Sequence, residues 1–173
     1  LLLRLKVSTT EDRQGNDMVS TVRLATPKDA VYLSNNLRAE DLEEIQSSHN
    51  IDPLEGLLEC FQLKNSQNYA AINENKECVA MFGVSDCPFV KGFGVVWLLS
   101  SDALQVEKRQ FVRESRQWVS QLNNKYSTIY NWVHPNNWKT LKWLQFCGFE
   151  PRLKHEYGVN NDEFILIMRT KNV

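Results

Sequence analysis

The stretch VHPNNWKTLKWLQFCGFEP, from Val133 to Pro151, carries the signals for a strand end, a helix and a return toward a core. Asn137 is of the residue type that caps a helix N-terminus. Gly148, eleven residues later, can adopt the left-handed conformation that ends a helix, and Phe149 carries the next segment inward. These positions predict a helix from about Asn137 to Cys147 between two strands.

The residues before this helix predict a strand–helix–strand unit. Gly92–Leu99 and Thr128–Val133 have the length and apolar content of strands. Between them, the residues from about Gln105 to Asn124 place apolar side chains on one stripe and most Lys and Arg elsewhere, as in a surface helix. Such a crossover is right-handed and sets its two strands parallel.

The rest of the chain predicts helices followed by antiparallel strands. Thr26 and Pro27 have the residue types of an N-cap and a first helical position. The expected elements are a strand over Val19–Ala25, helices from Thr26 to about Leu37, over Ala39–Ser47 and over Pro53–Lys64, and strands over Tyr69–Ile72, Glu77–Val84, Leu153–Tyr157 and Phe164–Arg169. We predict a mixed α/β domain over residues 18–173, with residues 1–17 as a flexible N-terminal extension.

Composition excludes several classes of protein. The chain has 173 residues, of which 42% are hydrophobic and 24% charged, as in one folded domain rather than a disordered chain. No apolar run approaches the roughly 18 residues that span a bilayer. The net charge of −1 excludes a generally basic protein. Residues 1–100 contain 9 Lys and Arg against 14 Asp and Glu, whereas residues 101–173 contain 11 against 7, so a local anion site stays open.

The cysteines and histidines favour neither disulfides nor a metal. Four cysteines lie far apart without CxxC spacing, which favours buried reduced thiols. Three scattered histidines form no pair with ligand spacing, so we expect no metal site.

The element order, together with VRLATPKDAVYL (Val22–Leu33) and the Val133–Pro151 stretch, resembles the GNAT superfamily of acyl-CoA-dependent N-acyltransferases. The resemblance covers about residues 20–170. It implies a mostly antiparallel sheet with two central parallel strands, flanked by helices. It also implies acetyl-CoA as the cosubstrate if the protein is an enzyme.

The residues that the resemblance implies for catalysis are largely missing. The pyrophosphate loop of the superfamily has the pattern (Q/R)xxGx(G/A), but LLSSDALQVEKRQF, from Leu98 to Phe111, contains no glycine. The general acid is a tyrosine seven residues after the helix-opening Asn, and Leu144 stands there. Gly92–Leu99 has no carboxylate to act as a base. The candidate coenzyme-binding positions are Leu98, Leu99, Ser100, Ser101 and Asn137.

His134 is the candidate catalytic residue. It follows a predicted parallel strand at the edge where open α/β sheets bind ligands, and its ordinary pKa suits acid–base work near neutrality. A histidine before a proline in a turn is also typical of a hydrogen-bonded loop residue, and both interpretations stay open.

A narrower resemblance suggests a different role. VWLLSSDAL, NNKYSTIYNWV, PNNWKTLKWLQFCGF and EYGVNNDEFILI are similar to the internal virion proteins, the gene-thirteen product family, of short-tailed bacteriophages related to coliphage T-seven. This resemblance implies a catalytically degenerate GNAT-like protein of virion assembly, with other phage structural proteins as partners. The location would be the virion interior or the cytoplasm of an infected bacterium. A working N-acyltransferase and a nucleic-acid-binding module remain alternatives.

The tryptophans divide into a buried set and one exposed residue. Apolar periodicity places Trp97, Trp118, Trp132 and Trp143 in the core or on a sheet face. Trp138, early in the last helix, is expected to be partly exposed. It could form a basic aromatic surface for an acidic partner, coenzyme phosphates or DNA, although a solvated helix face is the alternative. The basic residues of this surface are Lys139, Lys142, Arg109, Arg113 and Arg116.

Overall fold

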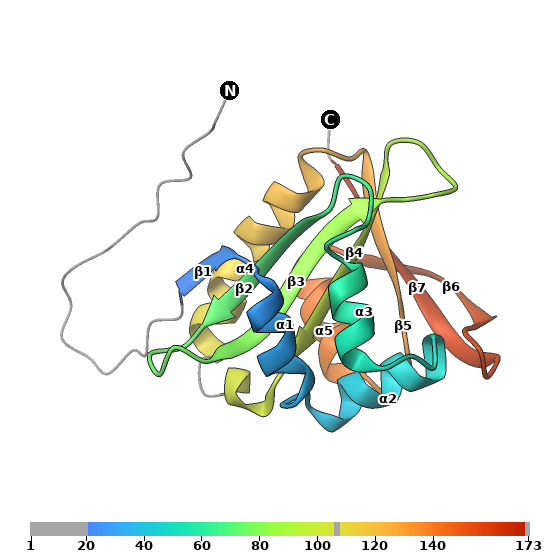
Figure 1. Cartoon of the computed structure of the whole chain (residues 1–173). Coiled ribbons are helices and arrows are strands. Elements are labelled where there is room, and N and C mark those ends of the chain that lie inside the picture. Colours follow the sequence, from blue (N-terminus) through green and yellow to red (C-terminus); the bar gives the residue numbers. More distant parts are fainter. Residues whose placement is uncertain (1–20, 106–107, 172–173) are drawn as a thin grey trace.

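The computed structural model describes residues 21–105 and 108–171, so the extension predicted over residues 1–17 lies outside it (Figure 1). Seven strands form one sheet in the order β1-β2-β3-β4-β5-β7-β6. The elements are β1 (Thr21–Leu24), α1 (Pro27–Ser34), α2 (Ala39–Ser48), α3 (Pro53–Glu59), β2 (Gln67–Ile72), β3 (Cys78–Asp86), β4 (Phe93–Ser100), the 3₁₀ helix η1 (Asp102–Gln105), α4 (Lys108–Asn123), β5 (Thr128–Val133), α5 (Trp138–Phe146), β6 (Glu150–Tyr157) and β7 (Asp162–Thr170).

The predicted mixed sheet is confirmed. β1 to β4 pair antiparallel in succession, β4 and β5 pair parallel, and β7 lies between β5 and β6 with antiparallel pairing on both sides. The parallel pairing spans only three positions and its last pair is Val95 with Tyr130. Both strands continue beyond that pair, so the centre of the sheet opens toward their carboxyl ends.

Helices cover both faces of the sheet (Figure 1). On one face, α1 and α3 pack through Leu33 and Leu57 on Met81 of β3. On the other face, α4 and α5 pack through Val119 and Leu144 on a core that includes residues of β3, β4, β5 and β7. The alternation of side chains along each strand lets both faces bury apolar residues. Among the helices that the structure describes, none is long and apolar enough to cross a membrane.

The Val133–Pro151 stretch forms its helix as predicted, with one difference at the cap. Gly148 has φ of +89° and Phe149 is buried. Asn137 occupies the N-cap position, but its side chain makes no cap hydrogen bond. Its Nδ2 instead donates to Glu44 Oε2 of α2 at 2.8 Å. The side chain is therefore oriented by a tertiary partner, and its Oδ1, the atom that would cap the helix, has no partner among the described residues.

Several element boundaries differ from the predicted ones, and α1 ends at Ser34 rather than near Leu37. α3 ends at Glu59 rather than near Lys64, because the chain continues in a turn with 3₁₀-type hydrogen bonds. The Asn68 side-chain amide donates to the Cys60 carbonyl at 3.0 Å, so this carbonyl is not available to extend the helix. The α4 helix begins at Lys108 after η1 rather than at Gln105. β6 begins at Glu150 and includes Pro151, which an edge strand tolerates because one side needs no N–H donor.

The four cysteines carry no disulfide bond. Cys78, Cys87 and Cys147 are buried, and Cys60 is half-buried. Within residues 21–105 and 108–171, no three His, Cys, Asp or Glu side chains gather as a metal site would require.

Candidate active site

The opening between β4 and β5 exposes polar backbone groups of β4. Ser101 N–H donates to Val79 O, which continues the β3–β4 ladder. Residues of an antiparallel strand bond alternately to either side, so Leu99 and Trp97 also face β3. The N–H and C=O of Leu98 then point toward β5, where the pairing has ended. Ser100 N–H points the same way and donates to Asp41 Oδ2 of α2 at 2.8 Å.

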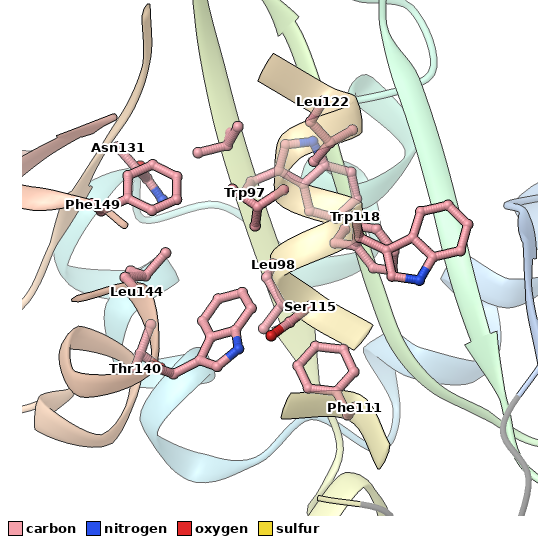
Figure 2. A pocket seen from close by; sticks show the side chains of 14 residues that line it. Trp97, Leu98, Phe111, Ser115, Trp118, Leu122, Asn131, Thr140, Leu144 and Phe149 are labelled. Atoms are coloured by element: carbon pink, nitrogen blue, oxygen red, sulfur yellow. The ribbon is translucent and has the colours of Figure 1, made fainter. Parts of the chain in front are cut away.

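Two cavities adjoin this opening. The inner cavity, of about 50 Å³, lies between β4, β5, α4 and α5 (Figure 2). The outer cavity, of about 100 Å³, lies at the end of β4 beside η1 and the first turn of α5. The residues that line both cavities are Leu98, Phe111, Thr140 and Trp143. The rings of Phe111 and Trp143 contact each other with centroids 5.6 Å apart, so this pair stands where the cavities meet.

A buried ion pair at the start of α2 lies beside the outer cavity, and its arginine also bonds α5. Arg38 Nη2 donates to Asp41 Oδ1 at 2.5 Å and to Thr140 Oγ1 at 3.0 Å. The Arg38 Nε and the Trp143 Nε1 are buried without a partner among the described residues, and both residues line the outer cavity. A buried donor without an acceptor is destabilising by roughly 1–3 kcal/mol. These two donors therefore mark places where a bound molecule with acceptor atoms would be stabilised.

Glu44 lies one helical turn beyond Asp41 on α2. Its carboxylate accepts the Asn137 side-chain amide at 2.8 Å and the backbone N–H of His134. Burial, with a smaller contribution from Asp41, raises the pKa of Glu44 to about 7, although the two donors act against the rise. A carboxylate with this pKa is suited to accept and return protons near neutral pH.

Sequence reasoning missed Glu44 as a functional residue. It sits among Glu40, Asp41 and Glu43 on an acidic helix, which by sequence is typical of a solvated surface. The superfamily resemblance implies a carboxylate base on the central strands, and Gly92–Leu99 contains no carboxylate. Only the packing of α2 on the ends of β5 and α5 distinguishes this carboxylate from its neighbours.

The predicted coenzyme-binding residues have different surroundings. Leu98 lines both cavities, and Ser100 and Ser101 line the outer one. The backbone N–H groups of both serines are already bonded within the protein, to Asp41 and to Val79. Leu99 packs on the α1–α3 face of the sheet, away from both cavities. Asn137 is buried against Glu44.

His134 is held as a loop residue beside Glu44. Its Nδ1 accepts the Asn136 N–H at 3.3 Å, and its ring packs edge-on against Phe164 with centroids 5.2 Å apart. As the described residues define them, neither cavity is lined by His134 or by Glu44. The contact that His134 makes with α2 is therefore made by its backbone, whose N–H bonds the Glu44 carboxylate.

The predicted phosphate loop lies partly outside the described residues, which omit 106 and 107. In the described part, η1 follows Ser101 directly at the outer cavity. Lys139 supplies a cation there, with its Nζ 3.5 Å from Glu40 Oε1. Lys139 and Arg38 are the charged side chains that line this cavity in the described part of the chain.

The basic aromatic surface predicted around Trp138 is present in part. Trp138 is 55% exposed, and Lys142 Nζ lies 4.8 Å from its ring centroid. Arg116 instead stacks 4.0 Å from the Phe146 ring and donates to the Phe146 carbonyl at 2.7 Å. The other four tryptophans are half-buried against the core or the sheet, as predicted.

The sheet order and the parallel pair that opens at the centre define the fold of the GNAT N-acetyltransferases. One similar solved structure is the aminoglycoside acetyltransferase AAC(6')-Ib with ribostamycin and coenzyme A, at 19% identity over 88% of this chain and 93% of that chain, with a TM-score of 0.64. A putative phosphinothricin N-acetyltransferase has 14% identity over 90% of this chain and 100% of its own, with a TM-score of 0.64. The ribosomal-protein-S5-alanine acetyltransferase from Vibrio fischeri has 19% identity over 89% and 97%, with a TM-score of 0.63.

At these identities the likeness establishes the fold alone. No protein-family model and no curated protein matches the chain. The narrower resemblance to phage internal virion proteins therefore finds no support in the comparisons, and the virion role stays a prediction.

Proposed function

We propose that the protein is an acyl-CoA-dependent N-acyltransferase. The observation that carries this proposal is the opening between β4 and β5, where the polar backbone of Leu98 adjoins a cavity lined by Arg38 and Trp143, each of which has a buried N–H without a partner among the described residues. Buried donors need acceptors, and a bound ligand with carbonyl groups would supply them. Similar structures of AAC(6')-Ib hold coenzyme A or acetyl-CoA, which supports a ligand of this chemistry.

The residues present fit an acyl-CoA molecule. Its arm carries amide carbonyls, which are acceptors for Trp143 Nε1–H and Arg38 Nε–H. The Leu98 N–H and C=O would pair with the arm as a neighbouring strand does. Lys139 places a cation at the outer cavity, where phosphate groups would be stabilised. Ser100 and Ser101 would line the arm through side chains, because their N–H groups are already bonded.

A bound acyl-CoA supplies a thioester carbonyl for attack by an amine. The Leu98 N–H, at the open edge of β4, is placed to donate to an oxygen on which negative charge develops. Glu44 takes the proton that the attacking amine must lose, because its pKa of about 7 leaves it half ionised at neutral pH. Asn137 and the His134 N–H hold the Glu44 carboxylate in place. Leu144 is buried and has no proton to give, so coenzyme A would leave as a thiolate and take its proton from solvent.

Titration calorimetry with acetyl-CoA tests this proposal. We expect saturable binding at micromolar concentration to the wild-type chain. The Trp143→Phe variant keeps the ring packed on Phe111 but loses the N–H, so its dissociation constant should rise about two- to tenfold. Trp132→Phe is the matched control, because Trp132 stacks on Tyr157 outside both cavities, and its affinity should equal that of the wild type.

The same titration separates the enzyme from a degenerate scaffold. The assembly role implied by the phage resemblance requires no coenzyme, so the absence of binding at millimolar acetyl-CoA would contradict the enzyme and favour that role. A nucleic-acid role around Trp138 and Lys142 requires DNA binding that weakens steeply with salt. A flat salt response would exclude it.

A further inference from the structure

The inner cavity begins where the parallel pairing of β4 and β5 ends. Val96 and Asn131 are the first residues beyond the last pair, Val95 with Tyr130, and both line this cavity. The cavity is therefore continuous with the narrow end of the opening. A group bound beside Leu98, which also lines it, can extend inward toward Val96 and Asn131.

The walls of the inner cavity are almost wholly apolar. Apart from Ser115, Asn131, Thr140 and the indole N–H groups of three tryptophans, the lining is aliphatic or aromatic. Figure 2 shows Leu98 and Ser115 facing the same space, with Phe149 and Asn131 on one side of it. The Ser115 hydroxyl is already used, since it donates to the Val112 carbonyl at 2.8 Å. The cavity consequently favours an alkyl group over a polar one.

The size of the inner cavity limits what it can take. An apolar cavity of about 150 Å³ binds benzene, which corresponds to roughly 25 Å³ for each carbon. At about 50 Å³, the inner cavity has room for about two carbons. With the acetyl group of a bound acyl-CoA held beside Leu98, where the two cavities meet, these two carbons would come in addition to the two of the acetyl group.

We propose that the inner cavity is an acyl-chain site and that the preferred donor carries an acyl group of about four carbons, rather than acetyl. This inference rests on the proposed acyltransferase function and adds the class of acyl donor to it. A longer chain must push aside Phe82, Trp118 or Phe149, which line the far side of a close-packed core. Affinity should therefore rise from acetyl to butyryl and fall for longer chains.

A series of acyl-CoA molecules tests this inference on the wild-type chain. Dissociation constants are measured by calorimetry for coenzyme A and for its acetyl, propionyl, butyryl and hexanoyl thioesters. Each buried methylene is worth about fourfold in affinity (0.8 kcal/mol), so butyryl-CoA should bind roughly 15-fold more tightly than acetyl-CoA. Hexanoyl-CoA should bind more weakly than butyryl-CoA.

A cavity-filling variant gives the second measurement. Ser115→Leu adds two heavy atoms at a buried position of α4 that lines the cavity, so the ratio of butyryl to acetyl affinity should fall to about one. Gln117→Leu is the matched control, because it adds the same side chain to the same helix at an exposed position. This control should keep the wild-type ratio.

The outcomes distinguish the two proposals. Binding of coenzyme A with equal affinities for all thioesters, or with acetyl preferred, overturns the acyl-chain site and leaves the acyltransferase in place. A butyryl preference that survives Ser115→Leu also overturns the site. Failure of every CoA compound to bind overturns the acyltransferase, and the acyl-chain site with it. The wild-type series decides the question even where Ser115→Leu fails to fold.

Discussion

Burial of Glu44 between α2 and α5 gives one carboxyl group of an acidic helix properties unlike those of its neighbours. Its pKa is raised to about 7, whereas that of Glu40, on the same helix, is lowered by the helix N-terminal backbone and by the nearby Arg38 and Lys139. Identical side chains four positions apart thus differ because one has lost water and the other has not.

Glu44→Gln tests the role of this carboxylate as a base. Ionised Glu44 predominates above its pKa, so wild-type turnover should rise with pH through about 7 and level off above it. The variant keeps an acceptor for the Asn137 amide but cannot take a proton, and turnover should fall about a hundredfold or more without the rise near pH 7. Acetyl-CoA affinity should stay unchanged. A variant whose pH profile matches the wild type would contradict the assignment.

The same substitution has a stability signature. A carboxyl group whose pKa is raised on folding contributes stability below its unfolded pKa of 4.5, and that stability is lost as pH rises through about 7. Urea unfolding should therefore show that the free energy of unfolding of Glu44→Gln, relative to that of the wild type, is higher at pH 8 than at pH 5.

His134→Ala tests whether the His134 imidazole or the Glu44 carboxylate is the catalytic group. If the imidazole were the catalytic acid or base, this substitution would lower turnover about a hundredfold at unchanged coenzyme affinity. Because the His134 ring bonds Asn136 N–H and packs on Phe164, we expect a smaller effect than that of Glu44→Gln. A larger fall in His134→Ala would return the catalytic role to the imidazole.

At the scale of elements, the β6–β7 hairpin supports the end of α2. Val159 N–H donates to the Ser48 carbonyl at 3.2 Å, and Gly158 approaches the backbone of Ser47 and Ser48. A Cβ at Gly158 would lie 2.5 Å from the Ser47 carbonyl oxygen, and its φ is +80°. The hairpin turn therefore holds the helix that carries Glu44.

Gly158→Ala should destabilise the fold and lower turnover together. The backbone clash and the left-handed conformation both oppose the methyl group, so the free energy of unfolding should fall by more than about 2 kcal/mol. Gly92→Ala is the matched control, since Gly92 has φ of +84° but its Cβ would meet only Ser127 Oγ at 3.5 Å. Urea unfolding should show the smaller loss for Gly92→Ala. Equal losses of unfolding free energy in the two variants would contradict a stabilising role for the contact between Gly158 and α2.

At the scale of the molecule, the opening divides the two halves of the sheet. β4 belongs to the β1–β4 meander, whereas β5 continues into the β7–β6 hairpin, and the halves share only the three parallel positions. The helices α2 and α5 connect the halves through Arg38–Thr140 and Glu44–Asn137. A ligand between β4 and β5 would add contacts to both halves of the folded state.

Acetyl-CoA should therefore raise the melting temperature. A ligand at 100 times its dissociation constant stabilises the folded state by about 2.7 kcal/mol, which for a chain of this size is a rise of roughly 5–10 °C. Differential scanning calorimetry with and without acetyl-CoA measures it. An unchanged melting temperature at that saturation would contradict binding in the opening.

Local patterns determined much of the fold. Thr128–Val133 forms its strand at the predicted bounds, and Thr26 with Pro27 opens α1, where Asp29 accepts the Thr26 N–H at 2.7 Å. The parallel β4–β5 pair was predictable because a strand–helix–strand crossover leaves few alternatives. Signals of this kind lie within a few residues of each other.

The candidate site was only partly predictable. Leu98, Ser100 and Ser101 follow from the superfamily resemblance and do line cavities. Glu44 and Trp143 were not assigned to the site, because the function of each depends on a partner far away in the chain. The Asn137 side chain shows the same limit, since its helix cap position was predictable and its bond to Glu44 was not.

The sequence by itself determined which strands and helices form and in what order, because backbone hydrogen bonding, glycine conformation and apolar periodicity act over short distances. Only the tertiary structure decided that the sheet opens after Val95 and Tyr130, that α2 buries Glu44 there, and that an apolar cavity lies at the narrow end of the opening. These features depend on packing and desolvation between side chains from distant segments, which local sequence patterns do not predict.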